Sequence, residues 1–384
     1  MTKRLLIGTL LVAVCCSLAP AEVIQLKSGK TVEGKILERT DTFVKMDTGI
    51  GVPVTYFKDE IEDASPTPSP AQTGFPEQQA GQIVAEPVLS QIRLNDAWPT
   101  FLIGQDVQSI DDFLAALKTS PSVKDIHYPN GIMAYTAIND VRGLSESVDH
   151  GAGVNFVDES LQKYPVSQVV QIGLYMKFML KEVVSGGLDD NITKMGRWIK
   201  NCNQRVYLRI GYEFDNPDNE YDPEEYIHAY RYVVDHLRKM DIPNVYFVWH
   251  TIAWRDPSWP IFDPMKWFPG DDYVDWVGIS FFDSQRDEER ETTAELARKL
   301  KKPLMIAESS PFNQYTVEGK LQWIRKLFKY IHDSDVQFLS YINVNWDVFP
   351  LFESQKWGDA RLENSPPLMA EWLKQIEQYR GQTP

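Results

Sequence analysis

From residue 98 to the C-terminus, short apolar runs alternate with stretches that carry apolar residues at helical spacing. An alternation of short apolar runs with segments whose apolar residues recur every 3.6 residues is typical of βα units in a parallel sheet. Four helical stretches stand out between the runs, at 110–117, 222–240, 287–300 and 317–332. The eight apolar runs that predict strands begin at Thr100, Gly131, Val169, Val206, Asn244, Asp275, Pro303 and Phe338.

Eight strand–helix repeats over residues 98–384 predict a (β/α)8 barrel, an architecture that typically takes about 250 residues. The alternative is an open doubly wound sheet, which commonly carries a Gly-rich phosphate-binding loop after a strand. No such loop follows any of the predicted strands. The sequence therefore predicts an α/β fold, a TIM barrel, for the larger part of the chain.

Three regions precede this barrel. Residues 22–63 contain short alternating runs separated by Gly turns, as in Thr31-Val-Glu-Gly-Lys-Ile, and predict a small all-β module of SH3-like design. Residues 64–97 begin with the Pro-rich sequence at 65–70 and have too few large apolar groups to fold, so they predict a linker and lead-in. Residues 1–21 have the basic start and apolar run of a signal peptide cleaved near Ala21.

Cleavage at that point predicts a secreted or periplasmic protein. No later stretch is long and apolar enough for a membrane helix, so no transmembrane segment is predicted. Lipid attachment at Cys15 or Cys16 is the less favoured alternative, because Val14 is bulkier than such signals usually tolerate. Of the three cysteines only Cys202 would then remain, which predicts no intrachain disulfide.

The charge of the chain mainly excludes classes of partner. The chain has 39 basic and 54 acidic side chains, a formal net charge of −15, which argues against a nucleic-acid partner. No His-Glu-x-x-His motif and no metal-binding cysteine pair occurs, so no metal or other cofactor is predicted. The charge is compatible with a neutral polymer as the substrate.

The ends of the predicted strands nominate the chemistry, because the active site of such a barrel lies at the C-terminal ends of its strands. The fourth strand ends in Arg209-Ile-Gly-Tyr-Glu213, and alternation along a strand places Arg209 and Glu213 on one face. The seventh strand ends in Met305-Ile-Ala-Glu308. Hydrolysis of a glycosidic bond requires two carboxyl groups, one to protonate the leaving oxygen and one to attack or to activate water. Glu213 and Glu308 are therefore the predicted catalytic pair.

These segments resemble glycoside hydrolase family 26, a clan A family that contains β-mannanases and related endo-glycanases. The Arg209 to Glu213 segment is similar to the family's Arg-x-x-His-Glu acid/base motif, and Lys302-Pro-Leu-Met-Ile-Ala-Glu308 looks like its nucleophile strand. Phe268-Pro-Gly-Asp-Asp-Tyr-Val-Asp resembles the family's Tyr-Pro-Gly-Asp-x-Tyr-Val-Asp block and is the most distinctive match. The resemblance runs from about Trp98 to the C-terminus.

The resemblance implies a retaining double displacement, with Glu213 as general acid/base and Glu308 as nucleophile. In retaining enzymes the two carboxyl groups are about 5–5.5 Å apart. β-Mannan is the family's commonest substrate and is the one implied first, with β-glucan and β-xylan as alternatives. Three departures bear on the choice of polymer: Tyr212 stands where the family usually has His, Asn216-Pro-Asp-Asn replaces the usual Asn-Gly-x-Trp stretch, and Ser280 stands where Asp is usual.

Aromatic and polar residues at the strand ends are the predicted substrate-binding set, because sugar rings stack on aromatic faces and sugar hydroxyls require polar partners. Strand parity leaves open whether Trp249 or His250 faces inward, and His250 is expected to support the site by hydrogen bonding. Trp346 matches the substrate-facing Trp that commonly ends the family's last strand. The set comprises Arg209, Tyr212, Trp249, His250, Trp254, Phe281, Trp346 and Asp347.

Two other classes of function fit a barrel of this composition. A non-catalytic carbohydrate-binding barrel would keep the cleft, but binding alone would not require both Glu213 and Glu308. An esterase or an aldolase would require a Gly-x-Ser-x-Gly elbow or a strand-end Lys with an activating partner, and neither stands out. The sequence therefore predicts a glycosidase, with the binding barrel as the open alternative.

Overall fold

The computed structural model describes residues 22–25, 31–39, 43–47, 54–57, 61, 92–96, 99–255, 262–282, 287–353, 355 and 357–381. The chain divides into two compact units, one within residues 1–80 and one within residues 81–384. The predicted signal peptide at 1–21 and most of the predicted linker at 64–97 lie outside the described residues.

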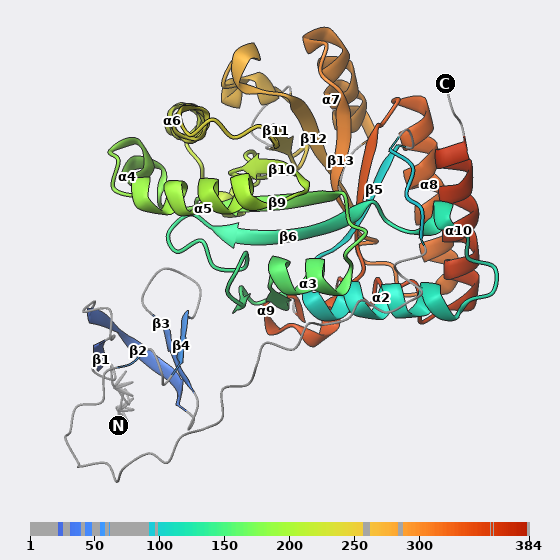
Figure 1. Cartoon of the computed structure of the whole chain (residues 1–384), viewed down its shortest axis with the longest axis horizontal. Coiled ribbons are helices and arrows are strands. Elements are labelled where there is room, and N and C mark those ends of the chain that lie inside the picture. The colour runs from blue at the N-terminus through green and yellow to red at the C-terminus, as the bar shows by residue number, and fades with distance from the viewer. Residues whose placement is uncertain are drawn as a thin grey trace, which may run out of the picture. The chain divides into compact units, whose positions relative to one another are not determined.

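The first unit contains a four-stranded antiparallel sheet in the order β1-β2-β3-β4 (Figure 1). A small cluster of buried apolar side chains forms its core, contributed by Ile24, Val32, Val44, Met46 and Ile61. The structure confirms an all-β module, whereas its SH3-like design stays a prediction. The strands are β1 (Glu22–Gln25), β2 (Thr31–Arg39), β3 (Phe43–Asp47) and β4 (Val54–Phe57).

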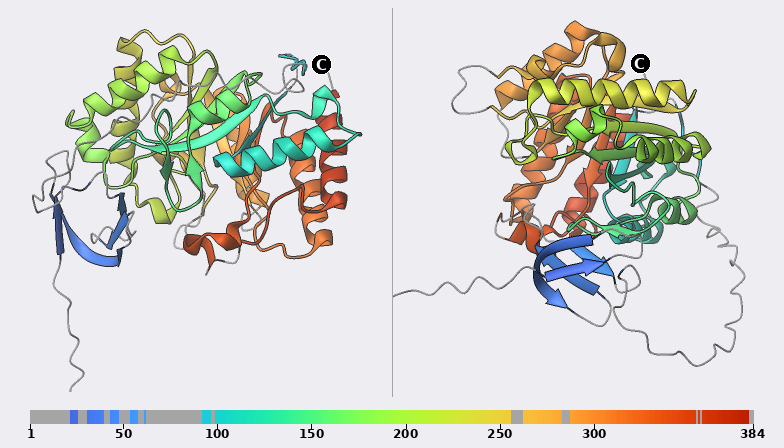
Figure 2. Two further views of the ribbon diagram at one scale, coloured as in Figure 1. Left: turned by 60° about the horizontal axis from the view of Figure 1, so that its bottom comes forward. Right: turned by 90° about the vertical axis from the view of Figure 1, so that its left-hand side faces the viewer.

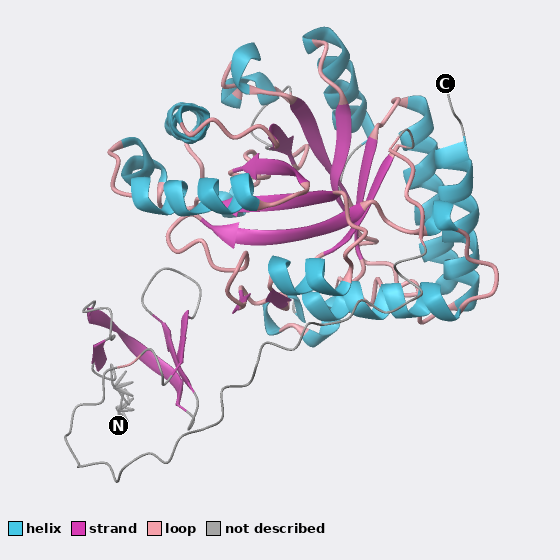
Figure 3. Cartoon of the chain, viewed as in Figure 1, coloured by secondary structure: helices cyan, strands magenta, loops and turns pink. Residues whose placement is uncertain are grey.

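The second unit is a closed barrel of eight parallel strands in the order β5-β6-β9-β10-β11-β12-β13-β14. Helices form a layer around these strands (Figures 2 and 3). Every strand begins within one residue of its predicted start, which confirms the (β/α)8 barrel. The strands are β5 (Thr100–Gly104), β6 (Gly131–Ala137), β9 (Val169–Tyr175), β10 (Arg205–Ile210), β11 (Val245–Thr251), β12 (Trp276–Phe281), β13 (Leu304–Ser309) and β14 (Phe338–Ile342).

All four predicted helices are present. Asp106 and Asp222 cap two of them by accepting hydrogen bonds from backbone amides of the first turn, as Asp does at helix N-termini. The four are α2 (Val107–Thr119), α6 (Pro223–Lys239), α7 (Asp287–Leu300) and α8 (Val317–Asp333). The structure adds α3 (Val157–Lys163), α4 (Leu180–Val184), α5 (Asp189–Asn201), α9 (Pro350–Glu353), α10 (Pro366–Gly381) and a hairpin of β7 (Val148–Asp149) and β8 (Val154–Asn155).

One repeat departs from the strand–helix pattern. In the described part of the connection from β11 to β12, the chain forms the short 3-10 turns η3 (Pro264–Trp267) and η4 (Asp271–Tyr273) in place of an α-helix. Similar turns occur at η1 (Asp125–His127), η2 (Pro217–Asn219) and η5 (Trp346–Val348).

Side chains inside the barrel change from apolar to polar along the strands. The apolar layer includes Tyr207 on β10 and Val248 on β11, and Tyr207 packs against Phe338 with 4.8 Å between ring centroids. Two residues further along the same strands come Arg209 and His250, which are fully buried. Because residues i and i+2 of a strand share a face, the apolar layer fills the barrel below and the polar residues form its mouth.

Arg380, in the last turn of α10, connects the C-terminal helix to the start of the barrel. Its buried guanidinium donates hydrogen bonds to the carbonyl oxygens of Pro99 (3.3 Å), Ile126 (2.7 Å) and Tyr128 (2.6 Å), and to the Asn130 side chain. These acceptors lie in the segments that lead into β5 and β6. Removing a buried donor of this kind is costly, because its acceptors then lose a partner away from water.

Replacing Arg380 with methionine is therefore expected to lower the barrel's free energy of unfolding by roughly 3–5 kcal/mol. Urea unfolding followed by tryptophan fluorescence measures this change. Arg325 provides the control: its side chain is 51% exposed and lies 3.4 Å from Glu371, so Arg325→Met should cost less than about 1 kcal/mol. Equal unfolding free energies for the two variants would contradict the role given to Arg380.

Candidate active site

Glu213 is aimed by a tight turn beyond the strand. β10 ends at Ile210, and both Gly211 (φ 54°) and Glu213 (φ 51°) adopt the left-handed conformation. Glycine is required at 211, because a Cβ there would lie 2.8 Å from the Tyr226 ring and 2.9 Å from Met176 Cε. The sequence predicted that alternation along one strand places Glu213 on the same face as Arg209. This reason is wrong, because the strand ends before Glu213. The turn after the strand brings the carboxyl group to the barrel mouth.

Glu308 faces into the barrel because of a β-bulge. Met305 and Ala307 belong to the apolar layer inside the barrel, so strict alternation would point Glu308 outward. The pairing of β12 with β13 shifts by one residue between Ile279 and Ser280, so that Ser280 pairs with Glu308. A bulge of this kind turns a side chain to the other face. Glu308 therefore contacts the polar residues of the barrel mouth.

A chain of contacts joins the two carboxyl groups. Ser280 Oγ donates a hydrogen bond to Glu213 Oε1 at 2.6 Å, and His250 Nε2 lies 2.9 Å from Ser280 Oγ. His250 Nδ1 lies 3.4 Å from Arg209 Nη1, which donates to Glu308 Oε1. Glu213 and Glu308 retain 7% and 6% of their surface exposed, so both are largely shielded from water. One connected polar cluster therefore holds both predicted catalytic residues.

Arg209 is fully buried and forms an ion pair with Glu308. Its guanidinium carbon also lies 5.0 Å from the Tyr135 ring centroid and 5.2 Å from that of Tyr212, at cation–π distance. A Cβ at Gly173 would lie 2.6 Å from the Tyr135 ring and 2.8 Å from Arg209 Nη2, so glycine leaves the room that this packing requires. The buried charge thus has a carboxylate and two aromatic faces as partners, as a desolvated charge requires.

The environment of Glu213 favours its protonated form. Burial is the main cause that raises the pKa of Glu213 to about 8, and the negative charge of Glu308 is the second. Hydrogen bonds from Ser280 and from Asn216, whose Nδ2 lies 3.0 Å from Glu213 Oε2, act in the opposite direction. At neutral pH the site therefore contains a protonated Glu213, while Glu308 is paired with Arg209. A protonated carboxyl group is what a general acid requires.

The raised pKa predicts the pH dependence of activity. Glu213 can donate its proton only while protonated, so kcat/KM should be lost as the pH rises through about 8 and should fall close to tenfold per unit above it. Initial rates at low substrate concentration between pH 5 and 10 measure this profile. An alkaline limb that stays in place when Glu213 is replaced would contradict the assignment of this titration to Glu213.

Two predicted substrate-binding residues lie away from the carboxyl groups. Trp249 is fully buried in the layer outside the barrel, where its ring stacks on Phe214 with 4.7 Å between centroids. Neighbouring strand residues point to opposite faces, and His250 takes the inward position. Phe281 likewise packs on the helical side, against Trp323 at 6.0 Å. Neither ring has an open face for a sugar, so the structure does not bring them into the site.

Trp346 and Asp347 lie just after β14. The indole N–H of Trp346 donates to Ser310 Oγ at 2.9 Å, two residues beyond Glu308, while its ring packs against Trp357 at 5.0 Å. Asp347 accepts a hydrogen bond from the backbone of Gly358 at 3.1 Å. Trp346 is therefore next to the end of β13, the strand that carries Glu308, whereas Asp347 stabilises a turn.

Asp215 is a site residue that the sequence did not single out. It is buried and accepts hydrogen bonds from Thr251 Oγ1 (2.6 Å) and from the backbone amides of Ile252 (2.8 Å) and Trp254 (2.9 Å). These contacts connect the turn that carries Glu213 to the loop after β11. Trp254 is 41% exposed beside that turn, in agreement with a role in binding sugar rings.

Ser280, Asn216 and Tyr135 were also not predicted as site residues. A signal was available for Ser280, because it is a polar residue two positions after Gly278 at the end of a predicted strand. Asn216 and Tyr135 offered no such signal. Their contacts with Glu213 and Arg209 depend on the turn after β10 and on the room left by Gly173.

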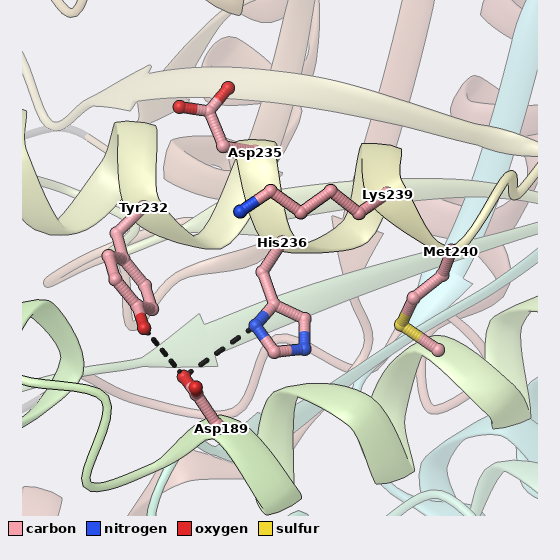
Figure 4. A pocket seen from close by; sticks show the side chains of 6 residues that line it. All are labelled: Asp189, Tyr232, Asp235, His236, Lys239 and Met240. Atoms are coloured by element: carbon pink, nitrogen blue, oxygen red, sulfur yellow. Dashed lines mark hydrogen bonds and ion pairs between the residues drawn. The ribbon is translucent and has the colours of Figure 1, made fainter.

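A surface hollow between α5 and α6 is separate from the site (Figure 4). Within it Tyr232 Oη donates to Asp189 Oδ1 at 2.8 Å, and His236 Nδ1 lies 3.6 Å from the same oxygen. The hollow is lined by residues of the outer helices and their ends, and none of them comes from a barrel strand. Its lining residues are Asp189, Tyr232, Asp235, His236, Lys239 and Met240.

A barrel mouth that holds two carboxyl groups, one of them with a raised pKa, is the arrangement found in glycoside hydrolases. Comparison with known proteins identifies the family. Residues 212–334, which include Glu213 and Glu308, match the family model described as "Glycosyl hydrolase family 26". The chain belongs to this family.

Two curated relatives are named as β-1,3-xylanases. The one from an Alcaligenes species is 30% identical over 306 residues, which cover 72% of this chain and 62% of the relative. The one from a Vibrio species is 31% identical over 305 residues, which cover 71% and 64%. The chain thus spans less than two thirds of the length of these relatives. A solved GH26 β-mannanase from Bacteroides ovatus shares the fold, with a TM-score of 0.51 and 14% identity over 73% of this chain and 90% of that one.

Proposed function

We propose that this protein is a retaining glycoside hydrolase that cleaves a β-linked polysaccharide, with Glu213 as general acid/base and Glu308 as nucleophile. The observation that carries the proposal is the contact chain from Glu213 through Ser280, His250 and Arg209 to Glu308. It holds two carboxyl groups at one barrel mouth, and the pKa of one of them, Glu213, is raised to about 8. A binding barrel would have no use for a buried carboxyl group with a raised pKa.

In the first step the Glu308 carboxylate attacks the anomeric carbon, and the bond to the leaving oxygen breaks. Glu213 donates its proton to that oxygen. Arg209 donates to Glu308 Oε1 and so fixes the orientation of the carboxylate. The product is a glycosyl ester of Glu308, and the released sugar chain carries the new hydroxyl group.

The second step requires Glu213 to act as a base. Once Glu308 is an ester, its negative charge no longer raises the pKa of Glu213, one of the two main causes of the shift. Glu213 can then take a proton from water, which attacks the anomeric carbon and breaks the ester. The sugar is released with its original β configuration, and Glu213 is protonated again.

We propose β-1,3-xylan as the preferred polymer. Two curated relatives of about 30% identity are named as β-1,3-xylanases, whereas the β-mannanase of 14% identity supports the fold alone. β-Mannan, which the family resemblance implies, is therefore the second candidate. β-1,4-Xylan and β-glucan are the remaining candidate polymers.

Hydrolysis of these four polymers by the purified full chain tests the proposal. Release of reducing ends should be fastest on β-1,3-xylan, and proton NMR of the early products should show the β-anomer before mutarotation. Early appearance of the α-anomer would contradict the retaining mechanism. Binding to insoluble polymer without any release of reducing ends would favour the carbohydrate-binding barrel.

We also propose that the protein is secreted or periplasmic, because residues 1–21 have the pattern of a signal peptide. Expression in a bacterial host with an export pathway, followed by mass spectrometry, should find a mature N-terminus at Glu22. In the part of the chain that the structure describes, no helix has the length and apolar character needed to cross a bilayer.

A further inference from the structure

The contacts between Arg209 and Glu213 have a defined direction. A guanidinium group can only donate, so the His250 nitrogen that faces it, Nδ1, must accept. His250 then carries its proton on Nε2 and donates it to Ser280 Oγ. Since Ser280 Oγ accepts on that side, its hydroxyl hydrogen is free to point at Glu213 Oε1, 2.6 Å away. The tautomer is assigned from the hydrogen-bond network, as is usual for histidine.

Burial leaves this arrangement few alternatives. Arg209, His250 and Ser280 are each fully buried, on the consecutive strands β10, β11 and β12. Burial and the charge of Arg209 hold the pKa of His250 well below its usual value, so the ring is neutral and needs one donor and one acceptor partner. Gly278 makes room for the neighbouring strand, because a Cβ there would lie 3.0 Å from Val248 Cγ1 and 3.2 Å from His250 Cβ.

We propose that His250 and Ser280 are positioning residues that direct the transferable proton of Glu213 to Oε2, the oxygen that faces Asn216. The proposal rests on the proposed function and specifies it further. Both oxygens accept a hydrogen bond, but the bond from Ser280 to Oε1 is the shorter one, at 2.6 Å against 3.0 Å for the bond from Asn216 to Oε2, so the proton of Glu213 is assigned to Oε2. Asn216 Nδ2, 3.0 Å from Oε2, holds that oxygen in place while it donates to the leaving group.

Ser280 affects both the orientation and the ionisation of Glu213. The charged or titratable groups around Glu213 are Glu308 on β13, Arg209 on β10, His250 on β11 and Asp215 on its own turn. Among the causes that act on the pKa of Glu213, the Ser280 hydrogen bond is the largest that lowers it. Loss of the hydroxyl should therefore raise this pKa further and let the carboxyl group rotate.

The test compares Ser280→Ala with Ser280→Thr, which keeps the hydroxyl. We expect Ser280→Ala to lower kcat/KM on the polysaccharide by roughly tenfold to a hundredfold, with KM nearly unchanged. The alkaline limb of its pH profile should move upward by roughly one to two units. Aryl glycosides with good leaving groups need no proton, so on them the first step should stay near its wild-type rate. Ser280→Thr should restore part of each property.

Ser167→Ala is the matched control. Ser167 is also buried, and its hydroxyl donates to the Val169 carbonyl oxygen at 3.2 Å, but it lies at the opposite end of the barrel. It should alter neither the pH profile nor the leaving-group dependence. If Ser280→Ala behaves like this control, the positioning role is wrong. Titration of ¹³C-labelled glutamate by NMR gives a readout independent of turnover. A wild-type protein inactive on all polymers would overturn the proposed function, whereas an unshifted Glu213 titration in Ser280→Ala would overturn the positioning role.

Discussion

Replacing Glu308 with glutamine is expected to lower kcat on β-1,3-xylan by roughly 10⁴- to 10⁶-fold, the range seen when a catalytic nucleophile is removed. Glutamine keeps the size of the side chain, and its carbonyl oxygen can still accept from Arg209. An amide, however, has no negative charge with which to attack the anomeric carbon. The loss should therefore appear in kcat, with binding of the polymer retained.

Reducing-end release measures the loss, and affinity electrophoresis in polymer-containing gels measures binding. Glu371→Gln is the matched control, because Glu371 is a largely buried glutamate that also pairs with an arginine, Arg325, but lies on the outer helix α10. Its activity should stay close to that of the wild type. In Glu308→Ala, azide should occupy the space of the carboxylate and yield an α-glycosyl azide. Undiminished hydrolysis by either Glu308 variant would exclude Glu308 as the nucleophile.

The strands of the barrel could be predicted because they are local features. Each is an apolar run that is buried on both faces, so its composition alone marks it. Helix α5 was not predicted, although Ile192, Met195 and Ile199 recur at helical spacing, because most of its residues are polar. Its burial depends on the neighbouring helix: a Cβ on Gly196 would lie 2.6 Å from Met240 Sδ of the chain after α6.

The sequence could nominate the two carboxyl groups that the structure brings to the barrel mouth, but not the way in which they are aimed. Period-two alternation is a rule for a regular strand, and it holds for neither glutamate: Glu213 lies beyond the end of its strand, and Glu308 follows a bulge. Glu213 lies in a left-handed turn that is set by packing around Gly211, and Glu308 is turned inward by a register shift against β12. Both effects come from neighbouring strands and helices, which no local pattern records.

The same limit applies to the walls of the site. Trp249 and His250 are adjacent, and either could have faced inward. Alternation says only that they face opposite ways; which one faces inward is known only once another residue of the strand has been placed in the barrel interior. Val248 belongs to that layer and fixes His250 as the inward residue. The polar contacts of His250 with Arg209 and Ser280 then follow from three neighbouring strands, not from one.

The second large effect is expected for Glu213→Ala, and it should depend on the leaving group. On the polysaccharide, kcat/KM should fall by roughly 10²- to 10⁴-fold, the usual contribution of general acid catalysis. On an aryl glycoside with a good leaving group, the first step needs no proton and should stay fast. The second step lacks its base, so the glycosyl ester of Glu308 should accumulate.

Stopped-flow release of the aryl group should show a burst followed by a slow steady state, and intact-protein mass spectrometry should detect the glycosyl ester. Azide needs no base to attack, so it should accelerate turnover and yield a β-glycosyl azide, because two inversions restore the configuration. On the polysaccharide, the residual activity of the variant should show no alkaline limb near pH 8, since that titration belongs to Glu213. An equal loss on both substrates, with no burst, would instead indicate that Glu213 holds the fold of the site and does not transfer the proton.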